Sequence, residues 1–364
     1  MRVYLVGAGV IARTHVEAAA TLEEPIEFRV ADVSAAMLAD FGEAYPDIPR
    51  FPDAAAMLAE PARDDDIVVV ATPPFAHLEP TLQAFASGRH VLCEKPLAMS
   101  TDEADRMLEA ADAAGRLLGC CSVRFRGLPH TETVRRVMES GVLGDVYHLS
   151  WVNKWARSRS GIEYQPASRW FLDRSKSGGG VLMDWGPYDL STLTDLFAPE
   201  RISVTAAATS RPVTSADPHD TVFDVETAAV ASLILHRPAG GLVVDFQRAS
   251  GTHGEEVFRA ELEGTLGSVR WAPFDSQADV VVRTDDGDGP VERIADPEPR
   301  APFTIFDYPL KHFVDAVRGR PSRALLGRDA VQSFRTIRSL YEVAATGDPA
   351  TIPFGATARA GADA

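Results

Sequence analysis

The chain has 364 residues, enough for two domains, because domains usually contain about 100 to 200 residues. Its hydrophobic content of 45% is ordinary for a globular protein, and no apolar run approaches the roughly 20 residues of a membrane-spanning helix. The net charge of -16 argues against nucleic-acid and anionic-membrane surfaces, which repel an acidic protein. We therefore expect no nucleic-acid partner and no membrane partner.

The three cysteines, Cys93, Cys120 and Cys121, form neither a disulfide framework nor a zinc-ligand spacing. This pattern favours a reducing compartment and predicts no metal site. The opening run Met1-Arg2-Val3-Tyr4-Leu5-Val6 is interrupted by glycines and precedes no small-residue cleavage site, which is not typical of a secretory leader. We expect a cytoplasmic protein.

The first 121 residues alternate strand and helix patterns. Ser100-Thr101-Asp102-Glu103 is a capping pattern that predicts a helix start. Such alternation predicts an α/β Rossmann domain with a doubly wound parallel sheet over residues 1–121. We expect strands at 3–6, 27–32, 67–71, 90–94 and 117–121, and helices at 35–45, 75–87 and 101–114.

After residue 122 the pattern changes to successive strands separated by short turns, which predicts an α+β domain over 122–355 with a large, mostly antiparallel open sheet. Residues 356–364 are rich in alanine and glycine and are expected to be a flexible tail. The predicted strands are 146–155, 202–210, 222–235, 241–249, 256–263, 268–271 and 279–283, and the predicted helices are 129–140, 181–196, 306–318 and 328–346.

Gly7-x-Gly9-x-x-Ala12 follows the first strand and opens a helix. The first glycine permits a tight turn, the second permits close approach of a pyrophosphate, and the small third residue permits packing of helix on strand. Free N–H groups at the helix N-terminus attract phosphate, so Gly7, Gly9, Val10 and Ile11 are expected cofactor contacts. Asp32, at the end of the next strand, is expected to bind the ribose hydroxyls.

Asp32 also bears on the choice of cofactor, because its carboxylate would repel a 2'-phosphate. No cation follows it among residues 33–38. NAD is therefore predicted and NADP is less favoured. NADP would require Arg29 or Arg50 to swing toward the phosphate.

Two further segments follow strands and are therefore expected at the carboxyl ends of the sheet, where ligands bind in open α/β folds. Thr72-Pro73-Pro74-Phe75-Ala76-His77 follows one strand, and Glu94-Lys95-Pro96 ends another. Thr72, Pro73, Glu94 and Lys95 are predicted cofactor contacts. His77 is either a neutral donor to the cofactor or a packing residue.

These segments, together with Ser177-Gly178-Gly179-Gly180-Val181-Leu182-Met183-Asp184-Trp185-Gly186-Pro187-Tyr188-Asp189, resemble the family of glucose-fructose oxidoreductase, inositol dehydrogenase and rhizopine-catabolism proteins, Gfo/Idh/MocA. The resemblance covers nearly the whole chain. It implies an NAD-dependent sugar or polyol dehydrogenase or reductase that transfers a hydride between a carbinol of a sugar, glycoside or cyclitol and the nicotinamide. Lys95 would be the catalytic lysine, and Asp184 would orient the hydroxyl.

Position 188 is histidine in many members, whereas Tyr188 resembles the branch with glucose-fructose oxidoreductase, xylose dehydrogenase and dihydrodiol dehydrogenase. Asp184 and Tyr188 lie four apart in one predicted helix and hence on one face. Free lysine and tyrosine have pKa values near 10.4 and 10, so either must be depressed to act as a base near pH 7. We expect Lys95 and Tyr188 to share the proton.

Arg124 lies where the domains meet and is either a cleft residue or a solvated linker arginine. The resemblance places the segment 154–176 near the mouth of the active site, with Trp170 able to stack on a sugar face, and Arg157 is an expected substrate contact. This segment contains six cations and only two acids, Glu163 and Asp173. The excess of positive charge indicates either a site that attracts an anionic substrate, or a loop that is solvated or contacts another subunit. These cations are Lys154, Arg157, Arg159, Arg169, Arg174 and Lys176.

Two other functions remain open in this sequence. One is redox-neutral, NAD-dependent glycoside cleavage by oxidation and elimination, and the other is a non-catalytic NAD-binding sensor. Lys95, Asp184 and a proton-competent Tyr188 argue against the sensor. Relatives assemble through the second-domain sheet, so a homodimer or homotetramer is expected. The resemblance also implies a cis bond before Pro96.

Overall fold

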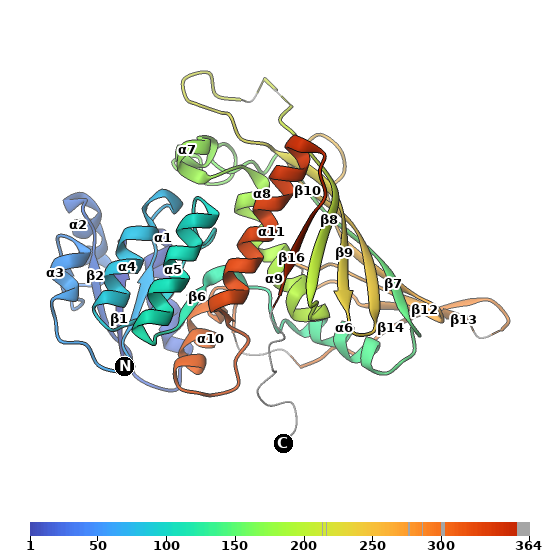
Figure 1. Cartoon of the computed structure of the whole chain (residues 1–364), viewed down its shortest axis with the longest axis horizontal. Coiled ribbons are helices and arrows are strands. Elements are labelled where there is room, and N and C mark those ends of the chain that lie inside the picture. Colours follow the sequence, from blue (N-terminus) through green and yellow to red (C-terminus); the bar gives the residue numbers. More distant parts are fainter. Residues whose placement is uncertain (213, 216, 276, 286, 300–302, 355–364) are drawn as a thin grey trace. The chain divides into compact units, whose positions relative to one another are not determined.

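A computed structural model describes the chain except for residues 213, 216, 276, 286, 300–302 and 355–364 (Figure 1). The predicted tail at 356–364 lies outside the described residues. The chain divides into two compact units. The first comprises Met1–Arg124 and Phe303–Phe334, and the second comprises the described residues of 125–302 and 335–354.

The first unit contains a seven-stranded sheet in the order β15-β6-β5-β4-β1-β2-β3. All neighbouring strands are parallel except β15, which pairs antiparallel with β6, so the predicted doubly wound parallel sheet is confirmed. The two-residue strands β3 and β15 were not predicted. The bounds are β1 (Arg2–Val6), β2 (Glu27–Ala31), β3 (Arg50–Phe51), β4 (Ile67–Val70), β5 (His90–Cys93), β6 (Leu118–Cys120) and β15 (Leu325–Leu326).

Side-chain caps begin three of the helices that accompany this sheet, including the one predicted at Ser100. Ser34, Asp53 and Ser100 each accept a hydrogen bond from the backbone N–H three residues later, which satisfies a donor that the helix leaves unpaired. Gly115, at φ +60°, ends α5 in the left-handed conformation. The helices are α1 (Val10–Ala18), α2 (Ala35–Ala44), α3 (Ala54–Leu58), α4 (Leu78–Ala86), α5 (Thr101–Ala114) and α10 (Tyr308–Val317).

Among the described residues, the predicted domain ranges and the compact units differ at 122–124, where the boundary lies, and in the longer segment 303–334. The prediction assigns it to the second domain, whereas the structure groups it with the first unit. The physical reason is the apolar face of α10, because Leu310, Phe313 and Val314 are fully buried in the core formed with β1 and β4. Burying such side chains contributes roughly 1.5 to 3 kcal/mol each.

The second unit contains a nine-stranded sheet in the order β14-β13-β12-β11-β7-β10-β9-β8-β16. Only β7 and β10 are parallel neighbours among the described strands, so the predicted mostly antiparallel sheet is confirmed. The bounds are β7 (Val146–Ala156), β8 (Arg201–Ser210), β9 (Ala228–Arg237), β10 (Gly240–Thr252), β11 (Val257–Gly264), β12 (Gly267–Trp271), β13 (Val281–Asp285), β14 (Pro290–Ile294) and β16 (Ala350–Pro353).

One face of this sheet is buried and the other is more exposed, as the alternation along β10 shows. Leu242 and Val244 are fully buried, whereas the intervening Val243 is 41% exposed. Figure 1 shows the helices of this unit with its sheet. They are α6 (Pro129–Glu139), α7 (Arg174–Ser177), α8 (Val181–Asp184), α9 (Gly186–Phe197) and the latter part of α11 (Gly327–Thr346). None of the described helices combines the length and apolar character needed to cross a membrane.

Candidate functional site

The glycine loop between β1 and α1 has the geometry expected of a dinucleotide-binding turn. Gly7 has a φ of +104°, and a Cβ there would approach the Ala71 carbonyl oxygen to 2.8 Å, so only glycine fits. At Gly9 a Cβ would meet no described atom within 4 Å, which leaves room for a ligand. No described side chain caps the N-terminus of α1. Its N–H groups can therefore bind the pyrophosphate of a dinucleotide.

Asp32 lies directly after β2 and braces this loop. One of its carboxylate oxygens accepts a hydrogen bond from the Ala8 N–H (2.8 Å), and the other accepts from the Ser34 N–H (2.8 Å). The carboxylate is half-buried at the carboxyl end of the strand, the position where an acidic residue meets ribose hydroxyls in this fold.

The segment after β4 is held by His77, which is fully buried. Its ring nitrogens lie 2.9 Å from the Thr72 carbonyl oxygen and 3.3 Å from that of Leu97. Burial lowers the pKa of His77 below its ordinary value. These contacts favour the packing interpretation of His77 over direct cofactor contact, while Thr72 and Pro73 remain partly exposed.

Glu94-Lys95-Pro96 follows β5, and the Lys95–Pro96 peptide bond is cis, as the resemblance implied. Glu94 is 5% exposed, and its Oε2 accepts a hydrogen bond from the Lys95 N–H (3.1 Å). Lys95 itself is partly exposed. Burial alone would raise the pKa of Glu94, but the hydrogen bond from His15 and the charges of Arg124 and Lys95 hold it well below its ordinary value. Glu94 is therefore ionised at neutral pH.

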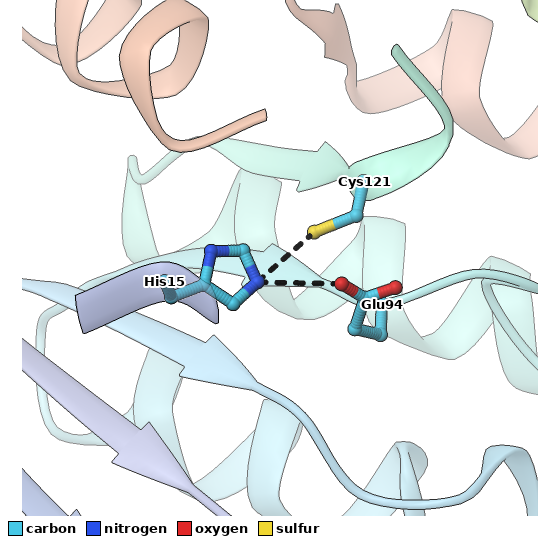
Figure 2. Close-up of side chains that lie close together, drawn as sticks. All are labelled: His15, Glu94 and Cys121. Atoms are coloured by element: carbon cyan, nitrogen blue, oxygen red, sulfur yellow. Dashed lines mark hydrogen bonds and ion pairs between the residues drawn. The ribbon is translucent and has the colours of Figure 1, made fainter. Parts of the chain in front are cut away.

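Figure 2 shows His15, Glu94 and Cys121 converging from α1, the end of β5 and the segment after β6. His15 Nε2 lies 3.3 Å from Glu94 Oε1 and 3.9 Å from Cys121 Sγ. Such donors can bind zinc, and the three ligand atoms lie within 4.8 Å of one another. The same Glu94 oxygen, however, lies 3.7 Å from the Arg124 guanidinium, so a dication would face a permanent cation. We interpret the cluster as a hydrogen-bond and charge network.

Arg124 belongs to this network. Its guanidinium faces Glu94 and lies 4.9 Å from the centre of the Phe306 ring. The side chain is 12% exposed, so Arg124 is not a solvated linker arginine.

In the second unit, the single helix predicted over 181–196 is wrong, because the structure has two helices, α8 and α9, with Trp185 between them. Pro187 is the cause: it has no N–H to bond the Met183 carbonyl, and its ring crowds that carbonyl. Asp184 ends α8 and Tyr188 lies in the first turn of α9. Both side chains are buried, at 7% and 3% exposure.

Asp184 lines a small pocket within the second unit, and Ser160 Oγ donates a hydrogen bond to its Oδ2. Tyr188 packs against the rings of Phe125 and Trp185, with centroids 5.3 and 5.4 Å apart. Tyr188 and Trp170 are not among the described residues that line this pocket.

The glycines before α8 serve a contact within the protein. The Glu226 carboxylate accepts hydrogen bonds from the N–H groups of Gly180 (2.9 Å) and Leu182 (3.0 Å) and from the Tyr341 hydroxyl (2.6 Å). A Cβ on Gly180 would lie 1.8 Å from the Glu226 carbonyl oxygen. The absence of a side chain at Gly180 thus permits close packing of α8 against Glu226.

Asp189 forms the most buried charge pair near this site. It accepts hydrogen bonds from Arg248 Nε (2.8 Å), Arg248 Nη2 and Trp151 Nε1 (2.8 Å), and both charged residues are fully buried. The Arg248 guanidinium lies 4.9 to 5.5 Å from the rings of Trp155, Trp185 and Phe274. The pair fixes α9, and hence Tyr188, against the sheet.

Acids pair with three of the six cations of the predicted basic segment. Arg159 is 4% exposed and pairs with Asp217 and Glu163. Lys176 pairs with Asp173. Arg174 bonds the Asp224 backbone and lies 3.9 Å from Glu226. Lys154, Arg157 and Arg169 have no ion pair among the described residues.

Of the predicted substrate residues in this segment, Arg157 is exposed and Trp170 is partly exposed. Trp170 stacks on Phe171 with ring centroids 3.9 Å apart. One face of the Trp170 ring is thus covered by protein.

Sequence reasoning missed His15, Ser160, Asp189, Glu226 and Arg248. The signal for His15 was available, because it follows Ala12 by three positions on the helix face that is buried with Ala18. Ser160, Glu226 and Arg248 act across long sequence separations, so no local pattern identifies their partners.

Two family models match the chain. One, described as an oxidoreductase family with an NAD-binding Rossmann fold, matches residues 1–121. The other, described as the GFO/IDH/MocA C-terminal domain, matches residues 131–270.

Similar proteins are sugar and cyclitol enzymes. The 1,5-anhydro-D-fructose reductase of Ensifer adhaerens is 28% identical over 80% of this chain and 81% of its own. The inositol 2-dehydrogenase of Rhizobium meliloti (strain 1021) is 27% identical over 79% of this chain and 80% of its own. The D-glucoside 3-dehydrogenase of Escherichia coli (strain K12) is 32% identical over 51% of each.

Solved structures share the fold. Levoglucosan dehydrogenase in complex with NADH and levoglucosan superposes with a TM-score of 0.79 at 19% identity, covering 97% of this chain and 100% of its own. The aldose-aldose oxidoreductase of Caulobacter crescentus in complex with glycerol gives a TM-score of 0.74 at 25% identity, covering 97% and 99%.

Proposed function

Because the chain belongs to the Gfo/Idh/MocA family of NAD-binding oxidoreductases, we propose that it transfers a hydride between a carbinol of a sugar, glycoside or cyclitol and NAD. The observation that carries this proposal is Glu94-Lys95-Pro96 at the carboxyl end of β5, where a partly exposed lysine follows a buried, ionised carboxylate. An amine at the ligand edge of a Rossmann sheet is suited to proton transfer with a substrate hydroxyl.

NAD rather than NADP is supported by the residues around Asp32. Arg29 Nε is bonded to Glu60 at 3.1 Å, and Arg29 also lies 3.6 Å from Glu27. Arg50 packs against Gly42, where its guanidinium would clash with any Cβ. Both arginines proposed as partners of a 2'-phosphate are thus engaged elsewhere, and Asp32 would oppose the phosphate.

The proton and the hydroxyl are assigned to three residues. Lys95 and Tyr188 handle the proton, and Asp184 orients the reacting hydroxyl. When bound, NAD supplies the hydride acceptor or donor. The hydrogen bond from Ser160 supports the role of Asp184, because it shows that the Asp184 carboxylate accepts from a hydroxyl group.

A neutral carbohydrate fits this unit better than an anionic one. Arg159 lines the pocket that contains Asp184, but it is already paired with Asp217 and Glu163. The relatives named for sugars and an inositol support the same substrate class. A higher catalytic efficiency on a uronic acid than on its parent sugar would contradict this preference.

The exposed face of the second-unit sheet supports assembly of a homodimer or homotetramer. A hollow on this face is lined by small and apolar side chains, among them Val152, Ala208 and Val230. Val230 is 48% exposed, and an apolar patch of this kind commonly marks a protein contact. Cys93, Cys120 and Cys121 are all buried, and we propose that the protein works in the predicted reducing, cytoplasmic compartment.

The direct test is a panel of sugars, glycosides, cyclitols and uronates assayed for NAD reduction by absorbance. A rise in NADH with a neutral sugar or cyclitol supports the proposal. Release of an aglycone without a rise in NADH would instead indicate redox-neutral glycoside cleavage. NAD binding without turnover on any compound would indicate a sensor.

Tyr188→Phe separates the two proton schemes. We expect a loss of kcat as large as that of Lys95→Met if the phenol carries the proton, and a mild loss if lysine does. Full activity of Tyr188→Phe across the pH range would remove Tyr188 from the mechanism.

A further inference from the structure

The carboxylate of Glu94 is fixed by donors from several elements. Its Oε1 lies 3.3 Å from His15 Nε2 and 3.7 Å from Arg124 Nη2, while Oε2 accepts from the Lys95 N–H. His15 belongs to α1, and Arg124 follows the short helix η3 (Cys121–Val123). A carboxylate held in this way presents a negative charge at one place beside Lys95.

His15 is 2% exposed, and its Nδ1 has no hydrogen-bond partner among the described residues. A buried ring nitrogen without a partner is unfavourable, so packing alone would favour an apolar side chain at this position. The contact made by Nε2 therefore explains why this position is occupied by a histidine. That nitrogen must carry the proton to bond the ionised Glu94.

The helix that carries His15 begins directly after the glycine loop (Figure 2 shows His15 on this helix). His15 lies in the second turn of α1, and Gly9 is the N-cap of that helix. The His15–Glu94 hydrogen bond thus ties the helix expected to bind the pyrophosphate to the residue that precedes Lys95.

We propose that His15 is a positioning residue for Lys95 and acts through Glu94: it holds the Glu94 carboxylate beside the lysine and couples that arrangement to the nucleotide-binding helix. This inference rests on the proposed function, in which Lys95 is the reacting lysine. The other titratable or charged groups that face Glu94 are Arg124, His77, Cys93 and Cys121.

Amine labelling of Lys95 tests the inference without any substrate. The full-length protein is exposed to acetic anhydride at one fixed pH, and acetylation of Lys95 is followed by mass spectrometry. Only the uncharged amine reacts, so the labelling rate depends on the charges that surround the amine. We expect Glu94→Gln to label about tenfold faster.

Two polar amide variants of His15 then show whether the hydrogen bond to Glu94 is what matters. The longer side chain of His15→Gln keeps an N–H within reach of Glu94, and we expect labelling close to that of the wild type. His15→Asn is too short to reach, and we expect labelling about threefold faster, toward the Glu94→Gln rate. His90→Gln, at the opposite end of β5, is the control for a histidine substitution and should not change the rate.

A double-mutant cycle decides whether His15 acts through Glu94. The effect of His15→Asn should vanish in the Glu94→Gln background. An unchanged or slower rate in His15→Asn, or an effect that persists without the carboxylate, would overturn the inference. If His15→Asn does not fold, an unchanged Lys95 rate in Glu94→Gln overturns it equally.

Failure of the proposed function would be seen separately. Labelling requires no turnover, so a dispensable Lys95 would appear as activity retained by Lys95→Met, whatever the labelling rates are.

Discussion

At the scale of single residues, the burial of a charge pair matters more for stability than the number of ion pairs. Asp189 and Arg248 are fully buried and joined by hydrogen bonds on two pairs of atoms, whereas Arg283 and Glu292 form an exposed pair. Burial raises the pKa of Asp189, and the charge of Arg248 offsets only part of that effect. Removing one partner of such a pair leaves the other charge buried without compensation.

We predict that Asp189→Asn lowers the free energy of unfolding of the second unit by about 3 to 5 kcal/mol. Glu292→Gln is the control and should cost less than about 1 kcal/mol. Urea unfolding followed by tryptophan fluorescence measures both, because all five tryptophans of the chain lie in the second unit. Equal effects of the two substitutions would contradict the importance assigned to the buried pair.

A second residue-scale prediction concerns pH. Burial lowers the pKa of His77, so below about pH 6.5 the unfolded chain binds a proton that the folded chain does not. This contribution to stability is complete above the pKa that His77 has in the unfolded chain, and it is lost as the pH falls below that value. We expect the melting temperature to fall between pH 7 and pH 5, and to fall less in His77→Gln.

The exposed His253 supplies the control. His253→Gln should follow the wild-type pH dependence of melting measured by circular dichroism. A His77→Gln protein with the full wild-type pH dependence would show that His77 does not contribute.

At the scale of elements, Gly9 and Gly180 have opposite surroundings. Gly180 touches the Glu226 backbone, whereas Gly9 faces space that the protein leaves open. The same substitution therefore has different consequences at the two positions.

We predict that Gly9→Ala leaves the melting temperature nearly unchanged but weakens NAD binding by about tenfold or more, because its methyl group occupies the approach of the pyrophosphate. Calorimetric titration with NAD measures this change. Wild-type affinity in Gly9→Ala would contradict the assignment of the loop.

Gly180→Ala should instead destabilise the second unit, because its Cβ would overlap the Glu226 carbonyl oxygen and disrupt the cap of α8. Its unfolding midpoint in urea should fall well below that of Gly9→Ala. Comparable midpoints would show that α8 accommodates the methyl group.

Most elements of the fold could be predicted because hydrophobic periodicity marks buried strands and helices. The sequence did not predict β14 because all five of its residues are exposed. It did not predict β3 and β15 because two residues are too few to show an alternating pattern. The break at Trp185 followed from Pro187 and was within reach of the sequence. The contact of Gly180 with Glu226 could not be predicted from the sequence, because the two residues lie 46 positions apart.

At the scale of the whole molecule, the chain returns from the second unit to the first through 303–334, so the two units are not simply consecutive in sequence. The predicted ranges treat 122–355 as one domain because the helix pattern of 306–318 carries no information about which core it joins. That choice depends on the contacts of Phe313 and its neighbours.

The proposed assembly makes a prediction at the same scale. Val230→Asp places a charge on the exposed sheet face and should shift the protein to monomers in sedimentation velocity, whereas Val222→Asp, at a similarly exposed valine outside the strands, should not. An unchanged assembly in Val230→Asp would exclude this face as the subunit contact.

We propose that Lys95 carries out chemistry on a carbohydrate hydroxyl while the glycine loop binds NAD independently. The most direct test of this division of roles is Lys95→Met, assayed for NAD reduction with the best sugar substrate and for NAD affinity by calorimetry. We predict a loss of kcat of about 10²- to 10⁴-fold, with NAD affinity changed by less than about twofold. Turnover near the wild-type rate would contradict it.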